Sequence, residues 1–367
     1  MTTHVALITT TINVPHVLAQ HVNNVPSDVE LTVVVAGDVQ TPVEARRFVE
    51  LLGGTYLGVD DDLVTRWSTN DQVGVRSIQR RNVALLHALT LGPDVVVTID
   101  DDNSPTCPET YVRDFVGALT APARYVTDSL TGWYNPACAL SYRLAHDARA
   151  PVYHRGFPLD QRDVMHDCET RPVAFDEPTP VGVAAGLWLG DPDVDALDRL
   201  VLRPRAVDFS PGVGCAGSAL NVGTWAPFNT QNTAYRWEVA PLMQCLVGVG
   251  RYDDIWASYV ARRVMDDLGW YVAYGEPLVV QDRNDHDLVR DLQDELLGYR
   301  RTPELIRRLR ALEVTFDDEN SVISGLESVY RQVADLLPSR TVDANGAWLE
   351  DVTVATGLGR RQREERT

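Results

Sequence analysis

The sequence is poor in positive charge and contains no lysine at all. Its 33 basic residues, all of them arginine, are outnumbered by 52 acidic residues, which gives a formal net charge of −19 and an isoelectric point of about 4.7. A surface of this sign repels the nucleic-acid backbone and anionic lipid, so no nucleic-acid or membrane partner is expected. An anionic substrate would have to be met by a local group of arginines or by a metal ion.

Cysteine and long apolar runs are also scarce. The five cysteines (Cys107, Cys138, Cys168, Cys215 and Cys245) are scattered, odd in number and without the paired spacing of a metal site. They are typical of reduced thiols in a cytosolic protein. The start of the sequence has no basic leader, and no apolar run reaches the ~18 residues of a membrane span. We therefore expect a cytoplasmic protein.

Short apolar runs alternate with helical patterns in the first third of the chain. Residues 5–8, 31–35 and 95–99 have the length and composition of buried strands. Helical signals follow at Thr41, expected to cap a helix that begins at the next residue, and over residues 74–89. This alternation predicts an α/β fold built on a doubly wound, mainly parallel sheet.

The rest of the chain reads differently. After a loop-rich middle part, polar-faced helical patterns occupy residues 287–312 and 321–337. We expect an α/β domain that could hold a nucleotide sugar over residues 1–290, a C-terminal helical extension over 291–340, and a flexible tail over 341–367.

The most informative stretch lies around the third strand. Residues 95–99 are β-branched and uninterrupted, as in a strand buried on both faces, and Asp100, Asp101 and Asp102 follow directly. Ligands of open α/β sheets bind beyond the carboxyl ends of the strands, which places these acids in a binding crevice. Adjacent carboxylates repel each other unless a cation lies among them, and oxygen ligands suit Mg²⁺ or Mn²⁺ held together with substrate phosphates. The alternative is a solvated acidic turn.

Two other strand ends share this edge of the predicted sheet. Thr9, Thr10 and Thr11 end the first strand, and Asp38 follows the second. A carboxylate such as that of Asp38 can accept hydrogen bonds from two N–H groups of guanine, or one from uracil. An Asx turn after the strand is the alternative for Asp38.

Arginines cluster at the start of the helix predicted over residues 74–89. Arg76, Arg80 and Arg81 lie near its first turn, where the helix dipole also favours anions. In so acidic a chain, this cluster is a candidate clamp for a diphosphate. The alternative is a solvated basic face.

Three sequence blocks together resemble a known family. They are Thr98-Ile-Asp-Asp-Asp102, then Arg155-Gly-Phe-Pro-Leu-Asp-Gln-Arg162 with Gly186-Leu-Trp-Leu-Gly-Asp-Pro-Asp-Val-Asp-Ala196, and finally Gly250-Arg-Tyr-Asp-Asp-Ile-Trp-Ala257. The chain is similar in these blocks to the plant reversibly glycosylated polypeptides, the UDP-arabinopyranose mutases. The resemblance implies a glycosyltransferase-A-like fold, a divalent metal (Mn²⁺ or Mg²⁺), and interconversion of the pyranose and furanose rings of a nucleotide-linked sugar.

The resemblance also assigns roles by position. Arg155 matches the arginine that the family glycosylates, Arg162 matches a second required arginine, and Asp253 with Asp254 match an acidic pair; these four are the expected catalytic residues. The metal would be held by Asp101 and Asp102. The nucleotide would be bound by Thr9, Thr10, Thr11, Asp38, Ser77, Arg80, Arg81, Asn82 and Asp100. Read without the family, Arg155 is a phosphate or carboxylate ligand.

One departure from the plant pattern bears on the metal site, and the composition bears on the choice of nucleotide. A histidine of the plant proteins is replaced here by Gln281, so the third metal ligand is either Gln281 or the nearby His286. The lysine-free, arginine-rich composition is typical of bacterial relatives that act on GDP-L-galactose or GDP-fucose, so a GDP-sugar in a bacterial pathway is the favoured substrate and a UDP-sugar the alternative.

Two other functions fit the same residues. One is a conventional metal-dependent glycosyltransferase with Asp253 or Asp254 as the base for an acceptor hydroxyl. The other is a self-glycosylating carrier within a larger assembly. The sequence leaves the sugar and the oligomeric state open, a homo-oligomer included.

Overall fold

A mixed sheet crosses the molecule in the computed structural model, which describes residues 2–121, 125–164, 168–172, 180–209, 218–283, 287–317 and 321–366. The strands along its main path, from one edge to the other, are β3 (Thr55–Leu57), β2 (Val29–Gly37), β1 (Thr3–Thr11), β4 (Val95–Ile99), β12 (Asn232–Arg236), β9 (Val181–Gly190), β13 (Tyr271–Gln281), β11 (Ser218–Leu220), β6 (Tyr125–Ser129) and β8 (Cys168–Pro172). Off this path, β5 (Asn103–Pro105) pairs with β13, and β10 (Arg205–Phe209) pairs with β9 and with β7 (Leu140–Arg143).

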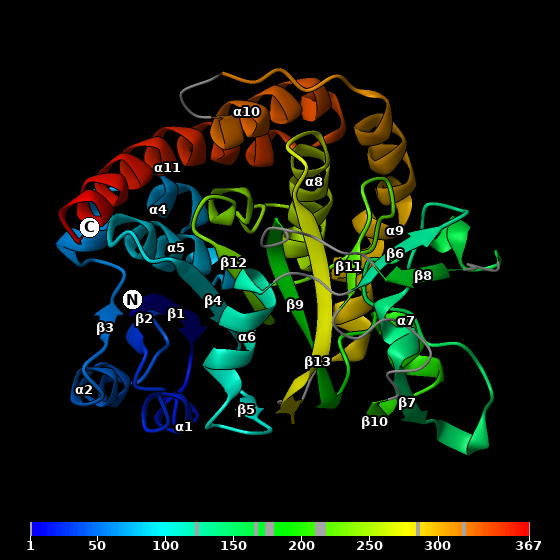
Figure 1. Ribbon diagram of the computed structural model, residues 1–367, viewed down its shortest axis with the longest axis horizontal. Helices are drawn as coiled ribbons and strands as arrows, with labels where there is room; N and C mark the ends of the chain where they lie inside the picture. The colour runs from blue at the N-terminus through cyan, green and yellow to red at the C-terminus, as the bar shows by residue number, and fades with distance from the viewer. Residues whose placement is uncertain are drawn as a thin grey trace.

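The first half of the sheet is parallel and the second half is mixed. Strands β1, β2, β3 and β4 run in one direction. Strand β12 is antiparallel to both β4 and β9, while β9 and β13 are parallel to each other. The carboxyl ends of β1, β2, β4, β9 and β13 therefore lie at one edge, together with the start of β12. The predicted α/β class with a large central sheet is confirmed (Figure 1).

Alternating side chains divide the core between the two faces of the sheet. In β1, Ala6 and Ile8 belong to one core, whereas Val5 and Leu7 belong to the other. This is the two-residue period of a strand that is covered on both sides. The described helices are α1 (Leu18–Val22), α2 (Val43–Leu51), α3 (Asp62–Thr65), α4 (Ser68–Val73), α5 (Arg81–Thr90), α6 (Tyr111–Thr120), α7 (Ala196–Val201), α8 (Asp253–Asp267), α9 (Leu288–Ala311), α10 (Ser321–Val333) and α11 (Ser339–Arg366). Helices α5, α8, α9, α10 and α11 pack on one face, and α1, α2 and α6 on the other.

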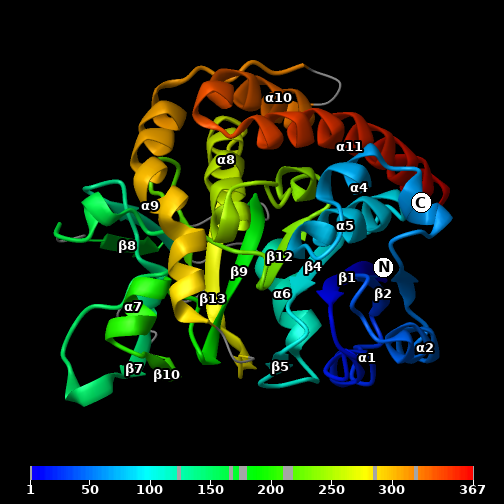
Figure 2. The same cartoon turned by 180° about the vertical axis from the view of Figure 1, so that it is seen from behind.

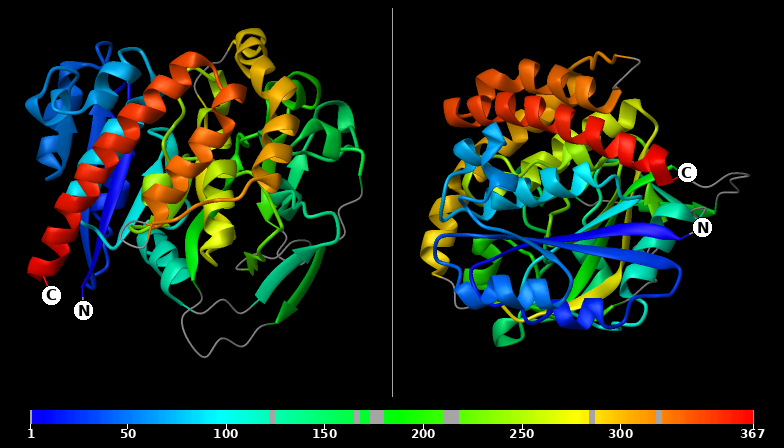
Figure 3. Two further views of the ribbon diagram at one scale, coloured as in Figure 1. Left: turned by 90° about the horizontal axis from the view of Figure 1, so that it is seen from above. Right: turned by 90° about the vertical axis from the view of Figure 1, so that its left-hand side faces the viewer.

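The C-terminal helices form an arch over α4, α5 and α8 (Figures 1 and 3), seen from the opposite side in Figure 2. The flexible tail predicted over residues 341–367 is wrong for residues 341–366, which belong to α11. This helix buries Trp348 and Val352 and accepts the backbone N–H of Thr69 on Asp351, which fixes it to α4. In the part of the chain that the structure describes, no helix combines the length and the apolar character needed to cross a bilayer.

Two local predictions are corrected at the carboxyl edge. Thr41 does not cap α2; its hydroxyl donates to the carbonyl of Thr11 and accepts from the N–H of Asp38, and so joins the ends of β1 and β2. The helix predicted over residues 74–89 begins only at Arg81, after a turn and a short 3₁₀ segment, Ile78–Arg80. A positive φ at Gly74 and at Arg76 breaks the earlier part.

Candidate functional site

A pocket of about 270 Å³ lies at the carboxyl edge of β1, β2 and β4. It is lined by Thr10, Thr11, Ile12, Ala36, Asp38, Gln40, Arg76, Ser77, Ile78, Arg80, Arg81, Asp100, Asp101 and Asp102. Most of the predicted nucleotide and metal residues therefore meet in one place, as expected for strand ends of a doubly wound sheet. Thr9 and Asn82, also predicted here, are fully buried and do not line the pocket.

The first of the three aspartates is neutralised by an arginine. Arg81 donates from Nη2 to Oδ1 of Asp100 at 2.5 Å and from Nη1 to the carbonyl of Thr230 at 2.8 Å. Burial by itself would lower the pKa of Arg81, but Asp100 outweighs it, so this pKa lies above its usual value. Arg81 is thus a buried partner of Asp100, which excludes the solvated basic face for this residue.

The other two aspartates form no ion pair with any described residue. The hydroxyl of Thr11 donates to Asp101, and the amide of Gln281 donates to Oδ1 of Asp102 at 3.3 Å. Burial, followed by the charge of Asp100, raises the pKa of Asp102 to about 6; burial also raises that of Asp101. Two half-buried carboxylates without an ion-pair partner among the described residues are what a bound cation would stabilise.

The donor atoms around this pair fit a hard divalent cation. Gln281, which ends β13 beside Asn103, is only 1% exposed, and its Oε1 is buried without a hydrogen-bond partner. An amide oxygen and two carboxylates are ligands that Mg²⁺ and Mn²⁺ accept, usually together with substrate phosphates. The described residues contain no group of three His, Cys, Asp or Glu side chains that would hold a metal unaided. His286, the other predicted ligand, lies outside the described residues.

Asp38 closes the far end of the pocket. Its Oδ1 accepts the backbone N–H groups of Val39 and Arg76, and its Oδ2 accepts that of Ser77. These three bonds outweigh the effect of burial, which is the largest single influence, and lower the pKa of Asp38. The carboxylate therefore ties the end of β2 to the loop before α5 and stays ionised. Of its four acceptor positions, one remains, on Oδ2.

Two predicted residues support the pocket from behind. Arg80 is 1% exposed and donates from Nε to the carbonyl of Gly37 and from Nη1 to the side chain of Asn70. Asn82 bridges the backbone of Cys245, with Oδ1 accepting its N–H at 2.7 Å and Nδ2 donating to its carbonyl at 2.8 Å. Both side chains hold loops in place, and Arg80 also lines the pocket.

Arg155 lies at the centre of a buried network. Its Nε donates to both carboxylate oxygens of Asp193 at 2.9 and 3.1 Å, its Nη2 donates to Asp254 at 3.1 and 3.3 Å, and its Nη1 donates to the carbonyl of Arg251. Burial opposes its charge, but Asp193 and Asp254 raise the pKa of Arg155 well above its usual value. The side chain is only 9% exposed and does not line the pocket.

This network reaches the pocket from two sides. Asp254 accepts the N–H of Thr230, whose carbonyl accepts from Arg81. On the other side, Asp193 also accepts from Asn229 at 2.6 Å and from Arg283 at 3.0 Å. We call the set of Arg155, Asp193, Asn229, Arg283 and Asp254 the Arg155 network.

Asp253 and Arg162, the remaining predicted catalytic residues, have separate surroundings. Asp253 begins α8, accepts from the amide of Gln79 at 2.8 Å, and has its pKa raised by burial and by Asp254. Arg162 donates to Asp195 and lies over the ring of Tyr153 at 4.9 Å. Neither residue lines the pocket.

Sequence reasoning missed several residues of the site. Asp193 lies three residues after the end of β9, Arg283 lies two residues after the end of β13, and Thr230 lies two residues before β12. The strand-end argument that found the three aspartates would have found these too, had the second half of the sheet been recognised. That half lacks the long β-branched run that marks β4, since β9 is rich in alanine and glycine and the sequence Gly275-Glu-Pro277 interrupts β13.

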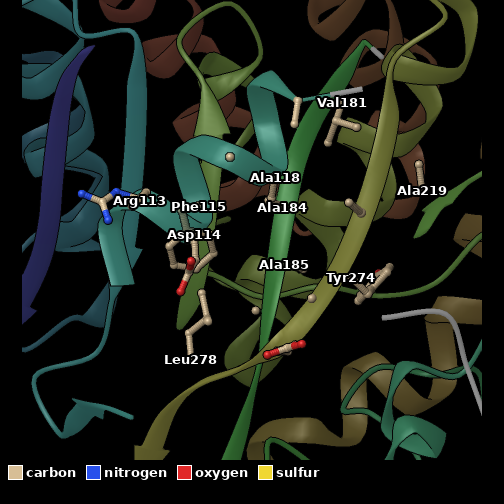
Figure 4. Close-up of a pocket in the computed structure, with 16 residues that line it drawn as sticks. Arg113, Asp114, Phe115, Ala118, Val181, Ala184, Ala185, Ala219, Tyr274 and Leu278 are labelled. Atoms are coloured by element: carbon tan, nitrogen blue, oxygen red, sulfur yellow. The ribbon is translucent and has the colours of Figure 1, made fainter. Parts of the chain in front are cut away.

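A second pocket, of about 600 Å³, lies between α6 and strands β9, β11 and β13 (Figure 4). Small side chains such as Ala118, Ala184 and Ala219 line it, with Arg113 and Asp114 at its side. None of the predicted site residues lines it. Because it lacks grouped acids or bases, we assign the chemistry to the smaller pocket.

The fold and the charged pocket thus define an α/β protein with a ligand site at the carboxyl edge of its sheet. Among curated proteins, the chain is 29% identical over 192 residues to probable UDP-arabinopyranose mutase 1 of Pisum sativum (49% of this chain, 51% of that one). It is 28% identical over 193 residues to UDP-arabinopyranose mutase 3 of Arabidopsis thaliana (51% and 50%). The chain spans about half the length of the curated relatives it matches. The predicted resemblance to this group is confirmed; no protein-family model matches the chain.

Solved structures that align with most of the chain include glucosyl-3-phosphoglycerate synthase from Mycobacterium tuberculosis. Its complex with Mn²⁺, UDP and glucosyl-3-phosphoglycerate aligns with a TM-score of 0.43 at 15% identity, over 86% of this chain and 85% of that one. The complex with Mn²⁺ and UDP-glucose aligns with a TM-score of 0.41 at 14% identity, over 86% and 84%.

Proposed function

We propose that this chain is a divalent-metal-dependent mutase that interconverts the pyranose and furanose forms of a nucleoside-diphosphate sugar. The observation that carries the proposal is the pair Asp101 and Asp102, two half-buried carboxylates that form no ion pair within the described part of the chain, beside the unpartnered amide oxygen of Gln281. The likeness to UDP-arabinopyranose mutases supports this choice among the reactions such a site can perform.

The two ends of the pocket suggest how the nucleotide lies. Ile12 and Ile78 are each 52% exposed and line the pocket, so they offer apolar surface to a base. Asp38 would accept an N–H of that base, and the diphosphate would lie toward Asp101 and Asp102. The bound cation would neutralise charge that collects on the diphosphate as its bond to the sugar breaks.

We propose a UDP-sugar as the substrate in place of the GDP-sugar favoured by composition. Guanine needs one acceptor on each oxygen of a carboxylate, but Oδ1 of Asp38 already accepts two backbone N–H groups. The position left on Oδ2 suits the single imide N–H of uracil. The curated relatives are named as UDP-sugar enzymes, which points the same way.

The reaction itself is an exchange of ring bonds without gain or loss of atoms. For an aldopentose, the bond from C1 to O5 breaks, a bond from C1 to O4 forms, and one proton moves from O4 to O5. Asp253 is the carboxyl we propose for the proton transfer: it lies behind the pocket but is linked through Gln79 to Ser77, which lines it, and its raised pKa lets it hold and release a proton near neutral pH. The diphosphate leaves C1 with the bonding electron pair and later returns to it, so the nucleotide must stay bound throughout.

We propose that Arg155 and Arg162 position other groups and do not carry the sugar. Every nitrogen of the Arg155 guanidinium already donates to a protein oxygen, and a guanidinium must lose a proton before it can attack a carbon. Arg155 instead holds Asp193 and Asp254 in place. Arg162 fixes the following turn through Asp195.

Incubation with UDP-arabinopyranose, UDP-galactose and their GDP counterparts, with Mn²⁺ and no acceptor, tests the proposal. A ring isomer is expected, lost on adding EDTA and restored by Mn²⁺ or Mg²⁺. Release of free nucleotide alone would identify a glycosyltransferase with Asp253 as base. A sugar adduct on the protein without turnover would identify a self-glycosylating carrier.

A further inference from the structure

Arg283 lies close to the metal-binding acids, just outside the residues that line the pocket, and keeps unused hydrogen-bond donors. It lies two residues beyond the end of β13, with its backbone N–H bonded to Asp191 at 3.1 Å and its Nη2 to Asp193 at 3.0 Å. A guanidinium has five N–H groups, and its Nε here is buried without a partner among the described residues. The side chain is 11% exposed, so these unused donors are held away from bulk water.

The carboxylate that Arg283 shares also accepts from two other side chains. Asp193 accepts from Nε of Arg155 on both oxygens and from Asn229 at 2.6 Å. Arg199, whose Nε and Nη2 donate only to the carbonyls of Val194 and Pro192, adds a further positive charge behind the same loop. Burial and then the charge of Arg283 lower the pKa of Arg199 to about 9. Asp193 and Asp254 balance the charges of Arg155 and Arg283, and Arg199 adds one further positive charge to this set, which favours an anion.

The position of Arg283 along the sheet edge indicates which part of a ligand it would contact. Asp38 follows β2, Asp102 follows β4, and Arg283 follows β13, farther along in the same direction. Residues Gln281 and Asn103 are paired across β13 and β5, which brings the end of β13 beside the acids. The charge of Arg283 also acts on Asp102, whose pKa it lowers against the larger effects of burial and Asp100.

We infer that Arg283 binds the phosphate nearest the sugar and holds the diphosphate in place while its bond to C1 is broken. This inference rests on the proposed function. It assigns Arg283 the distal phosphate, and leaves the phosphate next to the ribose to the loop before α5. A diphosphate held at both phosphates cannot drift away from C1 before it returns, which separates a mutase from a hydrolase.

Calorimetry with UDP and UMP, at constant Mg²⁺, tests this assignment on Arg283→Gln. UMP lacks the distal phosphate, so the variant should lose ~10- to 100-fold in affinity for UDP and stay within about twofold for UMP. Arg283→Lys should recover part of the loss, since a point charge still meets the phosphate. Asp193 keeps Arg155 and Asn229 in these variants, so the melting temperature should stay within a few degrees.

Arg205→Gln is the matched control. Arg205 pairs with Asp191 and with Asp282, which lie beside Arg283 and Asp193, but its side chain is 48% exposed where that of Arg283 is 11% exposed. It should leave both affinities unchanged. An Arg283→Gln protein that binds UDP as tightly as the wild type overturns the inference, as does an equal loss for UDP and UMP. Wild-type protein that binds neither UDP nor GDP overturns the proposed function, and the inference falls with it.

Discussion

Asp102 carries its charge in surroundings that favour its neutral form. Burial and the nearby charge of Asp100 raise its pKa to about 6, and the single donor to it is a side-chain amide at 3.3 Å. Between the usual carboxyl pKa and this value, the folded protein holds a proton that the unfolded chain has lost. The free energy of unfolding therefore falls as the pH rises through this window, and the deficit persists at neutral pH.

Asp102→Asn should consequently stabilise the metal-free protein by roughly 1–2 kcal/mol at neutral pH. This figure is smaller than the full pKa shift of Asp102 would give, because the carboxylate is partly exposed to solvent. The gain should vanish below about pH 4, where both proteins are uncharged at this position. Added Mn²⁺ should raise the melting temperature of the wild type and leave that of the variant unchanged. Thermal denaturation with EDTA or Mn²⁺ measures both effects.

Asp282→Asn is the control for this prediction, because its carboxylate is 75% exposed and pairs with a surface arginine. It should change stability by less than about 0.5 kcal/mol at any of these pH values. An Asp102→Asn protein that is less stable than the wild type at neutral pH in EDTA would show that the carboxylate is already compensated within the fold.

Replacement of Arg155 should destabilise the protein, in contrast to replacement of Asp102, because removal of the Arg155 side chain leaves two buried carboxylates short of a donor. Arg155→Ala should lower the free energy of unfolding by about 3–5 kcal/mol as well as abolish ring interconversion. Arg155→Lys keeps the charge but cannot reach Asp193, Asp254 and the carbonyl of Arg251 together, so an intermediate loss is expected. Urea denaturation and intact-protein mass spectrometry during turnover measure the two roles. A stable Arg155→Ala protein, or a sugar-sized adduct on Arg155 in the wild type, would refute the positioning role.

A site residue could be placed from the sequence only where the strand or helix next to it could be recognised. Asp100, Asp101, Asp102, Asp38 and Arg81 were placed at one edge, because each follows or precedes a clear element. Their partners were not predicted. Which carboxylate takes Arg81, and which carboxylates take Arg155, depends on contacts between segments far apart in the chain, and no local pattern contains that information.

At the scale of elements, the turn that carries Arg155 is built against α8. Gly156 has φ +83°, its carbonyl accepts from Tyr259 at 2.9 Å, and a Cβ placed on it would lie 2.1 Å from Cγ2 of Ile255. The close approach of the turn to the helix requires glycine here. The same contacts place Arg155 within reach of Asp254 in the first turn of α8.

Gly156→Ala should therefore destabilise the protein much more than Gly223→Ala does. Gly223 has a similar φ of +86°, but a Cβ there meets no atom within 4 Å. The control should lose only about 1 kcal/mol from the left-handed backbone, and Gly156→Ala at least ~2 kcal/mol more from the clash with Ile255. Urea denaturation measures both. Equal losses in the two variants would mean that α8 yields and does not constrain the turn.

Elements with a strong local signal were predicted closely, whereas those that depend on tertiary packing were not. Strand β4 occurs where the β-branched run indicates it. Helix α11 was missed, because its buried face contains Thr341, Asn345 and Thr356 beside Trp348, which makes a weak apolar pattern. It is stable because it packs on α4 and α5, the latter carrying Arg81 into the pocket.

At the scale of the whole molecule, the electrostatic field of the protein repels its proposed ligand. The net charge of −19 repels a nucleoside diphosphate at a distance, while Arg80 and Arg81, which line the pocket, act only at close range. Salt screens charges separated by more than ~10 Å at 0.1 M, and it screens buried contacts far less. The two contributions should therefore respond differently to ionic strength.

The association rate of UDP should rise about two- to tenfold when KCl increases from about 20 to 200 mM at constant Mg²⁺, since long-range repulsion is screened. The dissociation rate should change little, because it reflects contacts inside the pocket. Stopped-flow mixing followed by tryptophan fluorescence measures both rates, with uncharged uridine as the control that should show no salt dependence. An association rate that falls with salt would mean that a local basic field at the mouth of the pocket overrides the charge of the whole molecule. Arg76, which lines the pocket there, would then be the first residue to replace.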